Sequence, residues 1–415
     1  MRLKGFVVPI LATVAFFAST SRSAFAEEGG NPRLFLLNAD HLALAKRLWK
    51  AGNWEITFSM NEMIRHAKSA LRRGPYTVTD KKYLPPSGDK HDFCAIMGYS
   101  WPNPDTEDGM PWIVRDGYLN LDVKMDWARI KPMGQEVGVL ALAYYFTGRK
   151  EYAKHAALLL RTFFINETTR MNPNVNYGKI IPGVSKGGYT VAGFGYTFRQ
   201  IYDAAGILES SPSWTGADKK ALQQWTRQFM QWVETGPLGE IERKRDNNHG
   251  TFYDMVTALQ AMYIGDNAKA RAALQSYIDN RFSKQFKPDG TQPFAMKRVN
   301  NYDYHRCNLM IAFDIAQLAD HFEDIDLWNY KTAEGAGLRK SVEFLIPYFA
   351  RQKKWPYFRG DTFRIPPYAR LSLLRRAAVG FTDPSFEKAA RKIKGYNSLY
   401  ILNLTHPSSA AVTRR

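Results

Sequence analysis

Apolar residues recur every three to four positions along most of the chain, which is the spacing of one face of an α-helix. The first such pattern follows the cap-like Asp40 and continues through Leu42, Ala45 and Leu48. The periodicity predicts helices over residues 40–51, 55–72, 133–147, 150–165, 194–208, 217–234, 250–264, 267–282, 304–322, 334–350, 367–378 and 384–394. Short turns such as Thr147-Gly148-Arg149 join many of them, which favours antiparallel helical hairpins.

Two long segments interrupt the helical pattern. Residues 74–126 are rich in Pro, Gly, Asp and aromatic residues, and residues 166–193 are rich in Asn and Gly. Long loops inside a compact domain usually carry function. Since alternating β patterns are scarce, we predict an all-α fold. Hairpins closing around a central cleft, an α/α toroid, are one architecture that fits, although periodicity alone does not establish it.

The N-terminus has the features of a secretory signal peptide. Arg2 and Lys4 precede an apolar run from Phe6 to Ala18, and Ser23 to Ala26 ends in an A-x-A-like cleavage site. The alternative, a membrane anchor, is disfavoured because the run is short for a span. We therefore expect a signal peptide over 1–26, a single domain over 27–405, a frayed tail over 406–415, and a periplasmic or secreted protein without a membrane span.

The composition is that of a globular protein with a strongly basic surface. Cleavage after Ala26 removes three basic residues and lowers the formal net charge from +18 to +15. Such a charge suits nucleic acid, an anionic membrane or an acidic polymer, and export makes nucleic acid an improbable partner. The two cysteines, Cys94 and Cys307, either form a disulfide or stay as buried thiols, and the sequence leaves both open.

Two helix starts concentrate polar residues that suit anion chemistry. Asp246-Asn247-Asn248-His249-Gly250 opens one helix, where free backbone N–H groups and the helix dipole also favour an anionic group. Simple capping by asparagine is the structural alternative. Lys297-Arg298 precedes Tyr302, Tyr304 and His305, and a guanidinium near a tyrosine stabilises the phenolate. The alternative there is a core tyrosine with a structural hydrogen bond.

Two further segments, in the long loops, combine charges, amides and aromatic rings. They are Lys90-His91-Asp92-Phe93 with Tyr99-Ser100-Trp101-Pro102, and the run from Met171 to Tyr177. Each suits a sugar-binding wall, but side chains that only tie down a loop are the favoured interpretation for both. Metal-binding, nucleophile-elbow and phosphate-loop motifs are absent from the sequence, so we expect no metal and no cofactor.

These four segments resemble, in the same order, the alginate lyase superfamily of α/α-toroid polysaccharide lyases. The resemblance runs from about Leu34 to about Tyr400 and is closer to the family 38 glucuronan and alginate lyases than to the family 5 alginate lyases. It implies an α/α toroid, an incomplete barrel of antiparallel helical hairpins with long active-site loops. It also implies cleavage of a β-1,4-linked polyuronate, glucuronan or mannuronate-rich alginate, by metal-independent β-elimination that leaves 4,5-unsaturated ends.

The resemblance also implies roles for individual residues. Asn247 or Asn248 would neutralise the substrate carboxylate, Arg298 would support the carboxylate or the tyrosine, His249 would be a base or polarise the site, and Tyr304 would be the acid and possibly the base. In the family 5 pattern the arginine stands at the position of Lys297, and Tyr302 competes with Tyr304. The remaining candidate substrate contacts are Lys90, His91, Trp101, Asn174, Asn176, Tyr177, Lys297, Tyr302 and His305.

The chemistry of β-elimination explains these residue types. Neutralising the uronate carboxylate stabilises the enolate that forms as the C5 proton leaves, and an acid must protonate the departing O4. One alternative is a uronide-acting glycoside hydrolase, which needs two carboxyl groups; Asp92, Asp246 and Asp254 are the candidates, without a paired pattern. The other is a non-catalytic envelope protein that binds an acidic glycan.

Overall fold

The computed structural model describes residues 31–123, 125–188, 191–357, 367–393, 395 and 400–408. The predicted signal peptide lies outside these residues. The helices are α1 (Ala39–Lys50), α2 (Trp54–Ala70), α3 (Trp127–Thr147), α4 (Lys150–Leu160), α5 (Val191–Leu208), α6 (Gly216–Thr235), α7 (Pro237–Arg243), α8 (Asn248–Ile264), α9 (Asn267–Tyr277), α10 (Ser283–Gln285), α11 (Pro293–Met296), α12 (Asn301–Ala319), α13 (Leu338–Phe349), α14 (Pro367–Gly380), α15 (Pro384–Arg391) and α16 (Tyr400–Thr405). Two π-helical turns, η1 (Arg161–Ile165) and η2 (Ile278–Phe282), extend α4 and α9.

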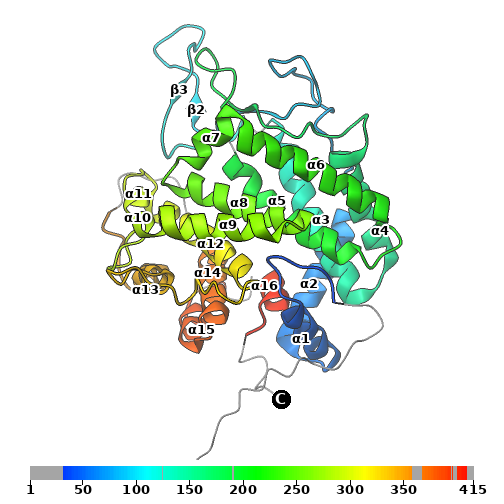
Figure 1. Ribbon diagram of the computed structural model, residues 1–415, viewed down its shortest axis with the longest axis vertical. Helices are drawn as coiled ribbons and strands as arrows, with labels where there is room; N and C mark the ends of the chain where they lie inside the picture. The colour runs from blue at the N-terminus through cyan, green and yellow to red at the C-terminus, as the bar shows by residue number, and fades with distance from the viewer. Residues whose placement is uncertain are drawn as a thin grey trace, which may run out of the picture. The chain divides into compact units, whose positions relative to one another are not determined.

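The longer helices form a ring, which confirms the predicted all-α toroid (Figure 1). Helices α2, α3, α5, α8 and α12 pack each on the next, and α14 follows α12. The short α16 packs on α2 and joins α14, where Arg375 donates to Asn403 Oδ1 at 3.0 Å. Outside this ring, α4 packs on α3, α9 on α8 and α15 on α14 as hairpin partners.

The ring helices α3, α5, α8 and α12 all begin at the same rim. The rings of Trp127 and Phe194 lie 5.2 Å apart, which places the starts of α3 and α5 together. Phe252 of α8 contacts Tyr196 of α5 at 4.8 Å, and Thr251 of α8 donates to Asn308 of α12 at 2.7 Å. Since each helix start carries partial positive charge, this rim favours an anionic ligand.

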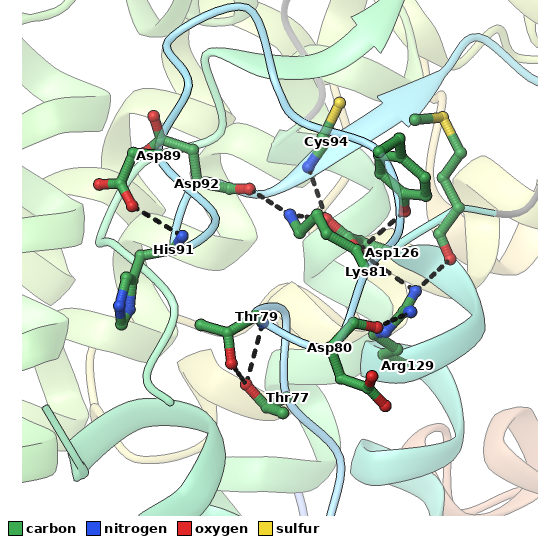
Figure 2. Close-up of polar contacts among 12 residues, drawn as sticks. Thr77, Thr79, Asp80, Lys81, Asp89, His91, Asp92, Cys94, Asp126 and Arg129 are labelled. Atoms are coloured by element: carbon green, nitrogen blue, oxygen red, sulfur yellow. Dashed lines mark hydrogen bonds and ion pairs between the residues drawn. The ribbon is translucent and has the colours of Figure 1, made fainter. Parts of the chain in front are cut away.

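The long segment between α2 and α3 is anchored by one buried carboxylate, Asp126, the residue before α3. Asp126 accepts from the ammonium of Lys81 at 2.6 Å, from the Tyr83 hydroxyl at 3.0 Å and from the backbone N–H of Cys94 at 2.8 Å. Lys81 also donates to the backbone carbonyl of Asp92 at 2.6 Å, and Arg129 contacts Asp126 from the first turn of α3 (Figure 2). The segment is therefore held to the helix rim by a fully buried ion pair.

Short strands join the two long loops. Strand β1 (Cys94–Ile96) pairs in parallel with β4 (Tyr177–Ile180), which brings the second loop against the first. Strands β2 (Ser100–Trp101) and β3 (Ile113–Val114) form an antiparallel pair, whose loops lie at the top of Figure 1. Cys94 and Cys307 are both buried and free, so of the two alternatives the structure supports unpaired thiols.

The C-terminal end differs from the expectation. His406, Pro407 and Ser408 are buried, and His406 contacts Gln317 at 2.9 Å while its carbonyl accepts from Arg375 at 3.0 Å. The prediction of fraying from His406 onward is therefore wrong for these three residues, because they are buried and hydrogen bonds of His406 tie the segment into the ring. Residues 409–415 lie outside the described part of the chain. No helix in the described ranges is both long and apolar enough to span a membrane.

Candidate active site

The start of α8 presents the amide cluster predicted from the sequence. Asn247 is the N-cap residue, and its Oδ1 accepts from the backbone N–H of His249 at 3.0 Å. The side-chain amide of Gln285 donates to the carbonyls of Asp246 and Asn247 at 2.8 and 3.2 Å, and to the Thr251 hydroxyl at 2.8 Å. Gln285 therefore holds this turn in place, and Asn247 caps the helix, as the structural alternative predicts.

His249 is held by a buried carboxylate. Its Nδ1 lies 3.0 and 3.2 Å from the two carboxylate oxygens of Glu242, and the Glu242 side chain is fully buried while that of His249 is 24% exposed. A carboxylate accepts, so Nδ1 carries the proton and donates it. In a neutral ring Nε2 is then the basic nitrogen.

The start of α12 and the preceding turn carry the second cluster. The guanidinium carbon of Arg298 lies 3.9 Å from the centre of the Tyr304 ring, and Arg298 forms a bidentate ion pair with Asp116. The Tyr304 hydroxyl lies 3.2 Å from that of Tyr99. Burial, above all, raises the pKa of Tyr304, the neighbouring Tyr99 adds to this, and Arg298 opposes it. A neutral, proton-donating Tyr304 is therefore the dominant form in the resting site.

The two clusters meet in one small cavity. Asn247, Asn248 and Tyr304 line it together, although they come from different ring helices. Its other lining residues are Gln285, Gln292, Phe294, Ala295 and Asn308. The cavity has a volume of about 10 Å³, enough for roughly one water molecule. The tertiary structure thus brings together the amide cluster and the catalytic tyrosine candidate, as the sequence predicts.

Lys179 of β4 adds a cation that interacts electrostatically with Glu242 and Arg298. Burial lowers the pKa of Lys179, with Glu242 opposing this shift and Arg245 and Arg298 adding to it. The ammonium is therefore within electrostatic range of Glu242, which holds His249, and of Arg298, which stacks on Tyr304. The site is therefore rich in positive charge at a helix rim that already favours anions.

Three predicted substrate contacts near α12 lie elsewhere. His305 is fully buried, its Nε2 accepts from the backbone N–H of Gln292 at 3.0 Å, and its Nδ1 donates to the carbonyl of Asn301 at 3.0 Å. The ring of Tyr302 packs 4.7 Å from that of Trp355, away from the cavity lining. Lys297 is exposed, with its ammonium 5.5 Å from the Phe294 ring. Tyr304 is therefore the member of this stretch that lines the cavity with the amide cluster, and Arg298 stacks on its ring.

The two loop motifs mainly hold the loops together. Asp92 accepts from the amides of Asn172 at 2.9 Å and Asn174 at 3.1 Å, which matches the loop-tying alternative. His91 Nδ1 lies 2.6 Å from the carbonyl oxygen of Arg170. Figure 2 shows His91 beside Asp89 and Asp92. The side-chain oxygen of Asn176 accepts a hydrogen bond from the indole N–H of Trp232 at 2.9 Å.

The other loop candidates are the residues left accessible. Lys90 is exposed, and Tyr177 is partly exposed at the start of β4. Trp101 is partly exposed, its indole N–H donates to the Tyr118 carbonyl at 2.9 Å, and the guanidinium of Arg115 lies 5.9 Å from its ring. An aromatic face beside a guanidinium suits the contact with an acidic sugar that the sequence predicts for Trp101.

Several residues of the site escape sequence reasoning. Tyr99 was considered only as a sugar-stacking ring, and Asp116, Lys179, Glu242 and Gln285 carried no recognisable motif. Tyr99 lies 205 positions from Tyr304, and Asp116 lies 182 positions from Arg298. A carboxylate or a tyrosine in a polar loop has no local signature of such a partner, so no signal in a single sequence identifies these contacts.

A second cavity, of about 920 Å³, lies between α3, α5, α12 and α14. Its charged lining includes Arg199, Asp314 and Arg376, which pair with one another at 2.8 and 2.6 Å. No predicted catalytic residue lines it. The predicted catalytic residues thus lie at the rim and not at the larger cavity.

The family model described as alginate lyase matches residues 77–355. The chain belongs to the alginate lyase family. This lyase is 31% identical to an alginate lyase from Bacteroides ovatus, over 90% of its own chain and 99% of that one, with a TM-score of 0.84. Alginate lyase A1-III from Sphingomonas species A1, in an apo form, is 16% identical over 76% and 82% of the two chains with a TM-score of 0.52, a likeness of fold alone. The search of curated proteins returned no match.

Family membership identifies the enzyme as a polysaccharide lyase. Of the three function classes that the sequence left open, family membership supports the lyase over the glycoside hydrolase and the non-catalytic glycan-binding protein. The identity with the Bacteroides ovatus enzyme over nearly the whole of both chains establishes the superfamily.

Proposed function

We propose that this lyase cleaves alginate, or a closely related β-1,4-linked polyuronate such as glucuronan, by metal-independent β-elimination. The observation that carries the proposal is the convergence of Asn247, Asn248 and Tyr304 on one cavity, with Arg298 stacked on the tyrosine. Alginate is the polymer named for the related enzyme from Bacteroides ovatus. The cationic rim provides the electrostatic attraction that a polymer with one carboxylate per sugar requires.

The proposed reaction assigns one task to each group. The amides of Asn247 and Asn248 bind the uronate carboxylate at the start of α8, where the helix dipole adds to the stabilisation of the enolate. His249 Nε2 takes the C5 proton, or His249 Nε2 first accepts the phenolic proton of Tyr304 and the phenolate then takes the C5 proton. The electron pair of the C5–H bond becomes the C4–C5 double bond, and the C4–O4 bond breaks. Tyr304 gives its proton to O4, so the products are a free hydroxyl and a 4,5-unsaturated uronate.

The hydrolase alternative has less support in this geometry. Asp254 is buried against Arg281 in an ion pair, and Asp92 accepts from Ser87 at 2.7 Å and from the loop amides. Asp246 pairs with Lys284 at 3.0 Å. Each candidate carboxylate therefore has a structural partner, and none of the three lines the cavity beside Tyr304.

The proposal is tested with purified alginate fractions, glucuronan and other polyuronates, read by the ultraviolet absorbance of the unsaturated product. We expect Tyr304→Phe to retain polymer binding and lose about 10²–10⁴-fold in turnover, which is the contribution of a positioned acid. Wild-type turnover in this variant would contradict the role of Tyr304. Chain shortening without ultraviolet absorbance would indicate hydrolysis, and strong inhibition by a chelator, reversed by one metal, would contradict the metal-independent scheme.

Export is part of the same proposal. The predicted cleavage after Ala26 would deliver the lyase to the periplasm or the medium, where a polymer outside the cytoplasm is accessible. Mass spectrometry of the protein recovered from expressing cells tests this, with a mature N-terminus at Glu27 as the expected result. A full-length chain retained in the cytoplasm would refute export.

A further inference from the structure

The buried carboxylate of Glu242 has one polar neighbour that belongs to the reaction centre. Both of its oxygens face Nδ1 of His249, at 3.0 and 3.2 Å, from the last turn of α7. The side chain has no exposed surface, whereas the imidazole reaches solvent over about a quarter of its area. A carboxylate in a site of low polarity interacts strongly with a single N–H donor, because water does not compete for it.

The backbone around Glu242 is fixed on both sides. A Cβ at Gly239 would lie 1.7 Å from the carbonyl oxygen of Val233, so α7 packs too closely on the end of α6 to accept any other residue there. The guanidinium of Arg281 donates to the carbonyls of Arg243 and Arg245 at 2.8 Å each, which clamps the turn between α7 and α8. Glu242 and His249 therefore keep a defined distance without help from a bound substrate.

We propose that Glu242 is the positioning residue of His249: it holds the imidazole in the tautomer protonated at Nδ1 and stabilises the imidazolium that forms when Nε2 takes a proton. The proposal rests on the proposed function, in the form where His249 Nε2 takes the C5 proton. A buried carboxylate that orients a catalytic histidine acts through the ring and not on the substrate. The ammonium of the neighbouring Lys179, on β4, interacts electrostatically with this carboxylate.

The test compares Glu242→Gln with Glu240→Gln, a matched substitution on the same helix. Glu240 pairs only at the surface with Arg243 and Lys244, so its replacement is expected to leave turnover within about twofold of wild type. In Glu242→Gln the side-chain amide donates to Nδ1, and the ring proton moves to Nε2. We expect kcat to fall by about 10²–10⁴-fold while KM changes by less than about threefold.

Side-chain nitrogen NMR of His249 supplies a readout that a purely structural role would not change. The wild-type enzyme should show the tautomer protonated at Nδ1, and Glu242→Gln should show protonation at Nε2. A wild-type ring protonated only at Nε2 would overturn the proposal even if the variant failed to fold. A folded Glu242→Gln enzyme with kcat within about threefold of wild type would overturn it as well. Absence of unsaturated product from the wild-type enzyme on every polyuronate would instead refute the proposed function, because the tautomer does not depend on the substrate.

Discussion

Asp126→Asn removes one charge from the buried ion pair that anchors the segment carrying Tyr99 and Asp116. The side chains of Lys81 and Asp126 have no exposed surface, and the ammonium has the carboxylate and the Asp92 carbonyl as acceptors (Figure 2). Asparagine keeps the shape and one acceptor oxygen. The Lys81 ammonium would then remain buried with neutral acceptors alone, which is the situation that makes a broken buried pair costly.

The expected loss follows from this geometry. Removing one partner of a buried pair costs about 3–5 kcal/mol. An unfolding entropy of about 2.1 cal/mol/K per residue over 415 residues corresponds to ~0.9 kcal/mol/K, so the Tm should fall by about 3–6 °C. Lys81→Met should cost less, because Asp126 keeps the Tyr83 hydroxyl, the Cys94 N–H and the Arg129 guanidinium as donors.

Differential scanning calorimetry of the wild type, both single variants and the double variant measures the coupling. With the ammonium removed as well, the double variant should be more stable than Asp126→Asn alone. Additive losses in the cycle would mean that the two charges do not depend on each other, and the reasoning from the buried pair would be refuted. Turnover measured well below the Tm provides the functional readout, since a loosened segment displaces Tyr99 and Asp116 from Tyr304 and Arg298.

Three further outcomes are expected. Tyr99→Phe removes the hydroxyl 3.2 Å from that of Tyr304 and should lower kcat by about 10–100-fold, the value of a hydrogen bond to a charged group; unchanged kcat would exclude Tyr99 from the proton transfer. Tyr302→Phe should keep kcat within about twofold, because that ring packs on Trp355; a large loss would reverse the assignment of Tyr304 over Tyr302. Burial lowers the pKa of His305 to about 4, so between pH 6.5 and pH 4 the unfolded chain binds a proton that the folded chain does not. The free energy of unfolding should therefore fall by about 1.4 kcal/mol per pH unit as the pH drops through this window. Urea unfolding at a series of pH values should show a weaker dependence of this free energy on pH in His305→Asn than in the wild type. An equal dependence in the two proteins would contradict this.

The local pattern predicted most ring helices, because a helix that packs on one side has apolar residues at helical spacing on its buried face. Helix α6 and the α8–α9 hairpin lie within a few residues of the predicted bounds. Helix α3 begins six residues earlier than predicted, because Trp127 packs on Phe93 at 4.8 Å and Phe194 at 5.2 Å and supports a first turn that precedes Pro132. The seven-residue α7 was not predicted, since its position depends on the close contact of Gly239 with Val233.

The sequence by itself determined the helical class and the two polar helix starts that carry Asn247, Asn248, Arg298 and Tyr304. Capping groups and the residues of a first turn are neighbours along the chain, so their chemistry is visible locally. Only the tertiary structure decided which distant groups complete the site, such as Tyr99 and Asp116. The tertiary structure also distinguished Tyr302 from Tyr304. Successive side chains on a helix point in directions about 100° apart, so the packing of α12 against its neighbours determines which tyrosine lines the cavity.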